Sequence, residues 1–440
     1  MTRRTYVGAL SGSLAVAEIA DAQGTAAARP PAGAGFDLSS FGIKADGTTD
    51  DTAAIQKALD EAAKTGSTVV LPPARYLVKG NLTIPPGGGL EGIHNAVVGQ
   101  GPLTGTVLLT TAGRDKEDAP AFIDMGSGTM VRGLMIFYPE QMPTDVRPYP
   151  WTFHLAGSDN TVENVTIVNT YNAIRVGPTG NGRHRLRSVV GCALRRGVLV
   201  DNTREIGRVD NVHWHCDFWG NRATNGNRAA VYEYMWKNLE AFTFGRTDWE
   251  YVTNTFVFPV KTGYRFIKTT NGACNGHFSG IGADSAQRCV SVEEIQPMGL
   301  LISNGEFVCI PGERIQLVVE PTCTGSVRLV NCAFWGPSRQ CVAMHGKGYL
   351  SLSDCYIEIS GRMPTGEPDQ ISLIEADSGR LQVRGCTLRS RGKEPNIVLK
   401  PGLTHAIISE NNGPKGVSIV NQIGSQAIIA NNEPPQPPVG

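Results

Sequence analysis

The chain has 440 residues and a formal net charge of zero, because 40 basic residues balance 40 acidic ones. This balance excludes the strongly basic surface that nucleic-acid binding requires, and no apolar run is long enough to span a membrane. We therefore expect neither nucleic acid nor a membrane among the partners.

The first residues resemble an export signal. Arg3 and Arg4 lie near the start, a mildly apolar segment follows, and positions 20–22 have the A-x-A spacing of a cleavage site. Residues 1–22 therefore predict twin-arginine export and a secreted or periplasmic protein. Residues 23–35 are rich in Ala, Gly and Pro and are expected to form a flexible leader.

The stretch 41–78 predicts a helix followed directly by a strand. Apolar residues recur at helical spacing from Ile55 to Ala62, and Gly66 stands where a left-handed residue would end the helix. Asp50 or Asp51 is expected to accept hydrogen bonds from the first helix amides. A β-branched run closed by two prolines then predicts a short strand.

The same stretch carries a family resemblance. The letters FG-x-K-x-DG-x-TDDT-x-AIQKA and TVVLPP-x-x-Y-x-V resemble the N-terminal cap of the pectate-lyase-like superfamily, which includes polygalacturonase-related hydrolases, polysaccharide lyases and phage tailspikes. The resemblance implies an all-β, right-handed parallel β-helix with an N-terminal capping α-helix. It places one solenoid domain at 36–433, before a Pro-rich tail at 434–440.

Repeated cysteine segments support a solenoid. SVVGCALR, RLVNCAFW, SLSDCYIE and QVRGCTLR share one alternating pattern around Cys192, Cys332, Cys355 and Cys386, and Cys216 is a looser fifth. Cys355 follows Cys332 by 23 residues and Cys386 follows Cys355 by 31. Gaps of this size correspond to one coil, so the thiols are expected to stack inward, reduced and buried. Disulfides between stacked cysteines are the alternative. Turn positions are expected at 304, 331, 354, 385, 411 and 431.

Aromatic residues gather where the repeat is interrupted. Residues 221–251 break the strand alternation and predict an insertion at the binding face, as insertions in solenoids often do. Aromatic rings pack against sugar rings, so tryptophans in and near this segment are candidate substrate-binding residues. They are Trp214, Trp219, Trp236 and Trp249.

Paired carboxylates are the expected catalytic groups, because glycoside hydrolysis needs two of them. His213, His215 and Asp217 alternate and should share one strand face, with Asp217 and His215 as catalytic candidates and His213 binding substrate. Asp248 and Glu250 should share a face of the next segment and supply the second carboxylate. A further catalytic candidate is Asp284.

Basic residues provide candidates for binding an acidic sugar. TGYRFIKT at 262–269 is similar to the R-I-K element of polygalacturonases, which implies substrate binding by Arg265 and Lys268, although the paired-aspartate and Gly-His-Gly motifs of that family are not found. Arg246 is a further binding candidate. No metal site or cofactor is expected, because His213 and His215 lack a third ligand; calcium is the exception if the protein is a lyase.

These patterns predict a secreted enzyme that cleaves a polysaccharide or oligosaccharide, with acid/base hydrolysis favoured. One alternative is a polysaccharide lyase that neutralises a uronate carboxylate with Arg246 or Arg265. Another is a glycan-binding β-helix without turnover. Sugar identity, linkage and oligomeric state stay open.

Overall fold

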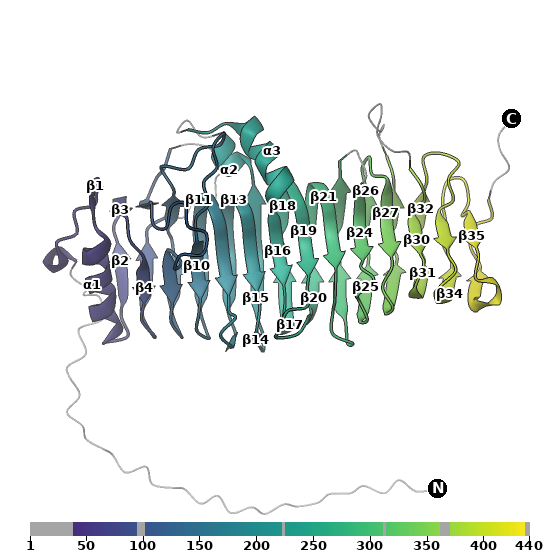
Figure 1. The fold of residues 1–440 in the computed structure, drawn as a ribbon, viewed down its shortest axis with the longest axis horizontal. Helices are drawn as coiled ribbons and strands as arrows, with labels where there is room; N and C mark the ends of the chain where they lie inside the picture. The colour runs from purple at the N-terminus through teal and green to yellow at the C-terminus, as the bar shows by residue number, and fades with distance from the viewer. Residues whose placement is uncertain (1–37, 95–101, 222–224, 311–313, 361–369, 436–440) are drawn as a thin grey trace, which may run out of the picture.

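The protein is a long stack of coils in which every registered strand pair is parallel (Figure 1). The computed structural model describes residues 38–94, 102–221, 225–310, 314–360 and 370–435. Successive coils contribute strands to three parallel sheets that run the length of the stack, here called sheets 1, 2 and 3. The predicted all-β parallel β-helix is thereby confirmed, and its right-handed sense stays a prediction.

The strands of each coil follow in the order sheet 1, sheet 2, sheet 3. Sheet 1 contains β2 (Thr68–Leu71), β5 (Gly89–Gly92), β8 (Met130–Arg132), the first parts of β11 (Thr161–Val176), β13 (Arg185–Val200) and β15 (Arg208–His215), then β17 (Thr247–Thr253), β20 (Cys274–Ser279), β22 (Leu300–Ser303), β25 (Ser326–Val330), β28 (Tyr349–Ser353), β31 (Gly379–Arg384), β34 (Leu403–Ser409) and β36 (Ala427–Ala430). Sheet 2 contains β1 (Asp46–Asp50), β3 (Ala74–Val78), β6 (Thr106–Thr110), β9 (Met135–Phe137), later parts of β11, β13 and β15, then β18 (Phe256–Phe258), the start of β21 (Gly282–Val292), β23 (Glu306–Cys309), β26 (Ala333–Trp335), β29 (Tyr356–Glu358) and β32 (Thr387–Arg389). Sheet 3 contains β4 (Leu82–Ile84), β7 (Ile123–Met125), β10 (Trp151–Leu155), the ends of β11 and β13, β16 (Glu240–Phe244), β19 (Val260–Phe266), the end of β21, β24 (Ile315–Val319), β27 (Gln340–Met344), β30 (Ile374–Ala376), β33 (Ile397–Leu399) and β35 (Ile419–Asn421). A separate two-stranded pair joins β12 (Asn181–Gly182) and β14 (Thr203–Arg204).

A single left-handed residue turns the chain from sheet 1 to sheet 2 in most coils. Asn and Gly tolerate positive φ at least cost, which explains their recurrence there. The residues are Gly133, Asn164, Ser188, Asn211, Asn254, Gly280, Asn304, Asn331, Asp354, Gly385, Glu410 and Asn431. Five of the six turn positions predicted from residue 304 onward are confirmed. The sixth is one residue earlier than predicted, at Glu410 rather than at 411.

The core of the stack is a continuous column of inward side chains. All ten cysteines are buried and free in the structure, which confirms that the predicted thiols point inward, and their reduced state stays a prediction. Cys332, Cys355 and Cys386 each follow a left-handed corner residue directly and so occupy equivalent positions in three coils. Burial raises the pKa of the Cys192, Cys274 and Cys341 thiols well above their ordinary value. These three cysteines therefore act as small apolar side chains.

Helix α1 (Thr52–Ala63) lies at the N-terminal end of the stack beside β2 and β4 (Figure 1). Its buried face is the predicted one, from Ile55 to Ala62, and Gly66 has a φ of 64° just beyond its end. Asp50 accepts a hydrogen bond from the amide of Thr52, the first helix residue, at 3.1 Å, as predicted for one of the two aspartates. The Asp51 carboxylate instead accepts from the amides of Lys44 and Ala45. That this helix caps the solenoid stays a prediction.

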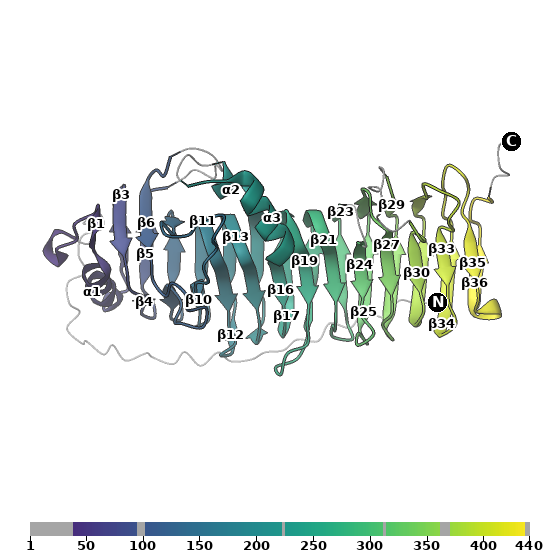
Figure 2. The same cartoon turned by 45° about the horizontal axis from the view of Figure 1, so that its top comes forward.

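The predicted insertion is shorter than expected. Two helices, α2 (Asp217–Gly220) and α3 (Arg228–Asn238), leave the stack after β15 and lie along one of its edges (Figures 1 and 2). The coil then resumes with β16 at Glu240 and β17 at Thr247, inside the range predicted to be an insertion. Short 3-10 helices, η1 (Ser39–Phe41) and η2 (Gly424–Gln426), complete the described elements.

Some predictions fall beyond the described residues. The export signal at 1–22 and the leader at 23–35 lie outside them, as does most of the 434–440 tail. Among the residues that are described, no helix is long and apolar enough to cross a membrane.

Candidate active site

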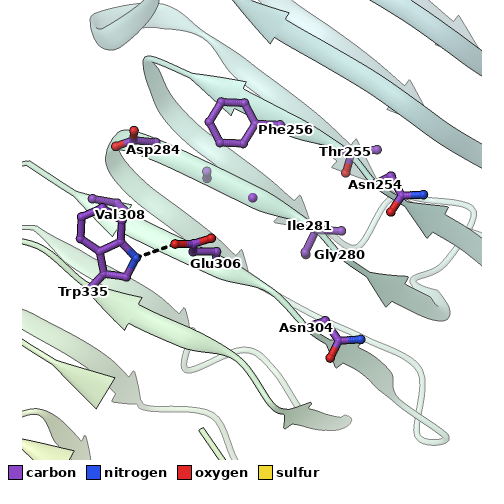
Figure 3. Close-up of a pocket in the computed structure, with 12 residues that line it drawn as sticks. Asn254, Thr255, Phe256, Gly280, Ile281, Asp284, Asn304, Glu306, Val308 and Trp335 are labelled. Atoms are coloured by element: carbon purple, nitrogen blue, oxygen red, sulfur yellow. Dashed lines mark hydrogen bonds between the residues drawn. The ribbon is translucent and has the colours of Figure 1, made fainter. Parts of the chain in front are cut away.

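The outer face of sheet 2 carries the candidate site. Strand register aligns His213 with Phe256, Phe256 with Gly282, and Gly282 with Glu306. Gly282 has no side chain, so the row is interrupted and a groove of about 350 Å³ opens between Phe256 and Glu306. The side chains that line it include Asn254, Phe256, Asp284, Asn304, Glu306 and Trp335 (Figure 3).

Asp284 is the acidic candidate that the structure places in this groove. It follows the short sheet 2 segment of β21, and the left-handed Ser285 (φ 51°) donates its backbone N–H to the Asp284 carboxyl. Burial raises the pKa of Asp284; the Ser285 hydrogen bond opposes that rise and the nearby Glu306 charge adds to it. Asp284 is therefore protonated at higher pH than an ordinary aspartate.

Glu306 supplies the second carboxyl group and has different surroundings. It is exposed at the start of β23, and the Trp335 indole N–H donates a hydrogen bond to its Oε1 at 2.9 Å (Figure 3). The Trp335 side chain is 39% exposed and lies beside this contact, where a ring face can pack against a sugar. The groove thus pairs a partly buried acid with a solvated carboxylate.

His213 and His215 lie on the same sheet face, next to the groove. The His213 ring contacts Phe256 edge-on at 5.2 Å, and the His215 ring stacks on Phe258 at 4.8 Å. Burial, with a smaller contribution from His215, lowers the pKa of His213 to about 4, and burial also lowers the pKa of His215 against the opposing Asp217 charge. Both imidazoles are therefore neutral at pH 7. The prediction that these two histidines share an outward face is confirmed.

Asp217 does not continue that face. Cys216 turns the chain into α2, so Asp217 is a helix residue and forms an ion pair with Arg228 Nε at 2.7 Å. Its backbone N–H donates to His215 Nδ1 at 3.1 Å. The strand alternation from which its catalytic role was predicted ends at His215, two residues before Asp217.

Asp248 and Glu250 do not share a face, contrary to the prediction. Trp249 between them is left-handed (φ 51°), and the register of β17 shifts there. Glu250 is consequently fully buried, bonded to His184 Nε2 at 2.8 Å and Thr247 Oγ1 at 2.7 Å. Asp248 stays outside in an ion pair with Arg246 at 2.7 Å. Neither carboxylate lines the groove of Asp284.

The four candidate tryptophans have separate locations. Trp214 and Trp219 are fully buried and present no ring face to a ligand, which corrects their predicted binding role. Trp236 is half-buried in α3 with the Arg314 guanidinium 5.1 Å from its ring centre. Trp249 is 57% exposed at the beginning of a sheet 1 strand.

The basic candidates lie away from the groove. Arg265 is on sheet 3, paired with Glu293 at 2.7 Å and Glu240 at 3.2 Å. Lys268 is exposed just beyond the same strand. Neither residue lines the groove, and Arg246 is already paired with Asp248.

Sequence reasoning missed Glu306 and Trp335. Alternation in GEFVCI and CAFWG would point both side chains outward, but only the coil register shows that they approach one another and Asp284. The register depends on turn lengths that no local pattern fixes.

One cluster in the described residues could offer three ligands to a metal ion. It consists of His215, Cys216 and Asp217, whose donor atoms lie within 4.8 Å of one another. Asp217 is already paired with Arg228, and burial raises the pKa of Cys216 to about 12, so the cluster is poorly suited to a metal.

Comparisons with known proteins confirm the family resemblance at the N-terminus. Residues 36–96 match the model of the family described as rhamnogalacturonase A/epimerase, pectate lyase-like. No curated protein matches the sequence.

Solved structures with a similar chain path include three with low sequence identity. The Dettilon tailspike protein (gp208) has 13% identity and a TM-score of 0.48, over 89% of this chain and 66% of that one. The A-module of the Azotobacter vinelandii mannuronan C-5 epimerase AlgE4 has 13% identity and a TM-score of 0.45, over 89% and 99%. The catalytic unit of the GH87 alpha-1,3-glucanase from Streptomyces thermodiastaticus strain HF3-3 has 14% identity and a TM-score of 0.43, over 93% and 73%. These likenesses assign neither a reaction nor a substrate to this chain.

Proposed function

We propose that the protein is an exported glycoside hydrolase that cleaves a polysaccharide or oligosaccharide in the sheet 2 groove. The observation that carries the proposal is the pair of carboxyl groups with unlike surroundings, Asp284 and Glu306, beside the half-exposed Trp335. The family match supports a carbohydrate substrate, but it covers 36–96 and none of the groove residues. The reaction is therefore argued from the groove alone.

In this proposal Asp284 is the general acid. Its raised pKa favours the protonated carboxyl group, which donates its proton to the glycosidic oxygen as the bond breaks. Glu306 is the second carboxyl group and acts from the other side, either on a water molecule or directly on the sugar carbon. Trp335 orients Glu306 through its indole N–H and offers its ring to the sugar.

A polysaccharide lyase is the second candidate, and the contacts of its arginines disfavour it. Arg246 and Arg265 were the residues expected to neutralise a uronate, yet each already pairs with a carboxylate at 2.7 Å. The residues that line the groove include no arginine or lysine to act as the base. A binding protein without turnover is the third candidate.

A panel of polysaccharides, read by product mass, distinguishes the three. Both cleavage reactions create a new reducing end, but hydrolysis adds one water to each cleaved bond, whereas elimination adds none and gives an unsaturated product that absorbs in the ultraviolet. Glu306→Gln should abolish the new reducing ends while binding persists. Products that carry the unsaturation, or binding without any product, would reject the hydrolase proposal.

Two tryptophan variants separate the roles of Trp335. Trp335→Phe keeps an aromatic face but removes the N–H that reaches Glu306, so kcat should fall more than KM rises. Trp335→Ala removes both and should also raise KM by up to about tenfold, the value of one aromatic contact. Asp217→Asn, on α2 and ion-paired with Arg228, is the matched control and should leave both constants near normal.

A further inference from the structure

Sheet 1 carries a second exposed surface in its C-terminal half, on a different face from the groove. A hollow of about 400 Å³ lies over β25, β28, β31 and β34. Its polar and aromatic lining consists of Ser326, Arg328, Tyr349, Arg380, Gln382 and His405, here called the sheet 1 arginine patch.

Tyr349 stands between two guanidinium groups in this patch. The Arg328 guanidinium carbon lies 5.8 Å from the Tyr349 ring centre and that of Arg380 lies 5.6 Å from it. The register places Tyr349 opposite Arg380, and Arg380 opposite His405. The Tyr349 hydroxyl donates to Gln382 Oε1 at 2.9 Å, which holds the ring in place.

The positive charge of the patch is not neutralised within the described part of the chain. Arg328 and Arg380 are both exposed, and no described carboxylate lies within 4.0 Å of either guanidinium. This contrasts with Arg384 on the same sheet, which pairs with Glu410 at 2.7 Å. Unpaired guanidinium groups held at fixed spacing on strands are suited to bidentate recognition of an anion.

The strands around the patch contain no acidic residue at all. The six consecutive sheet 1 strands β20, β22, β25, β28, β31 and β34 carry histidine and arginine but neither aspartate nor glutamate. An aromatic pair continues the surface toward the N-terminus, since Tyr251 stacks on His277 at 5.1 Å. From β17 to β34 this face extends over about 29 Å at the usual strand spacing.

We propose that the sheet 1 arginine patch binds an anionic glycan, whose carboxylate or sulfate groups contact Arg328 and Arg380 while a sugar ring packs near Tyr349. That the ligand is a glycan rests on the proposed function; that it is anionic rests on the patch alone. The site holds the polymer outside the catalytic groove, because sheets 1 and 2 meet at the left-handed corner and face different directions. Its occupant is extended, since the face is long.

The test measures binding by a full-length chain that carries Glu306→Gln, so that turnover does not consume the ligand. The probes are polygalacturonate, its neutral methyl ester, dextran sulfate and single-stranded DNA. We expect polygalacturonate or dextran sulfate to bind, and the tighter of the two identifies the anion as carboxylate or sulfate. The methyl ester should bind at least about tenfold more weakly, because it has lost the charge-assisted contacts.

Variants of the patch test whether Arg328 and Arg380 bind the polyanion. Arg328→Gln with Arg380→Gln should weaken binding about tenfold or more, the corresponding lysine pair should give an intermediate loss, and Arg384→Gln should change nothing. All three sites are exposed, so the fold should persist in circular dichroism. Unchanged binding by the glutamine pair, failure of both polyanions to bind, or tighter binding of DNA would overturn the inference. Absence of hydrolysis by the wild-type chain, with patch binding intact, would reject only the proposed function.

Discussion

Asp284→Asn is the substitution that tests the mechanism most directly. Asparagine keeps the size of the side chain and an oxygen for the Ser285 N–H, but it cannot donate a proton to the leaving oxygen. A positioned general acid contributes about 10²–10⁴ in rate. We therefore expect kcat to fall by about that factor, equivalent to about 2.7–5.5 kcal/mol of transition-state stabilisation, with KM little changed.

The leaving group provides the sharpest assay for this variant. An aryl glycoside with an acidic phenol departs without protonation, so Asp284→Asn should lose far less activity on it than on the natural glycan. The pH profile gives a second reading. Because Asp284 must be protonated and its pKa is raised, wild-type activity should fall as pH rises through that pKa, and the variant should lack this limb.

Stability provides an independent check on the raised pKa. The Asp284 pKa is higher in the folded state than its ordinary 3.8, so the folded chain binds this proton more tightly than the unfolded chain does. The contribution to stability is complete below pH 3.8 and is lost as pH rises through the folded-state pKa. Asparagine does not titrate, so the Asp284→Asn variant does not lose stability in this way. The Tm of the variant minus the Tm of the wild type should therefore increase from acid to neutral pH.

Several outcomes would refute this assignment. Near-normal turnover of Asp284→Asn with an intact fold removes Asp284 from the mechanism. An equal loss on the activated and natural substrates indicates that the residue does not act as the acid. A larger loss in the Asp217→Asn control than in Asp284→Asn would return the site to α2.

Three further predictions concern the scaffold. Cys355→Ser should lower the free energy of unfolding by about 1–3 kcal/mol, since it buries a hydroxyl. Thiol titration of the wild type should find Cys355 reactive only in denaturant. A disulfide at Cys355 in mass spectrometry of the native protein would contradict both expectations. Asn331→Ala should lower the free energy of unfolding in urea by about 1–2 kcal/mol, because alanine tolerates the φ of 52° less well than asparagine and cannot make the 2.8 Å hydrogen bond to Asn304. Asn331→Gly should cost less, because glycine adopts positive φ freely. The His213 ring should titrate near pH 4 by NMR, and a titration near 6.5 would show that the ring is solvated. Because the folded-state pKa of His213 is below 6.5, its contribution to stability is present above pH 6.5 and is lost as pH falls toward 4.

The sequence by itself determined the architecture. Parallel strands in a solenoid repeat the same local chemistry in every coil: inward apolar residues, a left-handed corner and an outward polar residue. These are properties of a few adjacent residues, so the buried cysteines, the face of helix α1 and most of the corner positions could be predicted without knowledge of any other coil. The 41–78 stretch likewise carried the family resemblance within one segment.

Only the tertiary structure decided the site. Asp284, Glu306 and Trp335 belong to three successive strands of sheet 2, and their approach depends on the lengths of the turns between those strands. Local alternation also failed where the backbone departs from a strand. The chain turns at Cys216, the residue before α2, and diverts Asp217, and the left-handed Trp249 turns Glu250 into the core. A side chain's face depends on every residue before it in the strand, so one irregular residue reverses the prediction for all that follow.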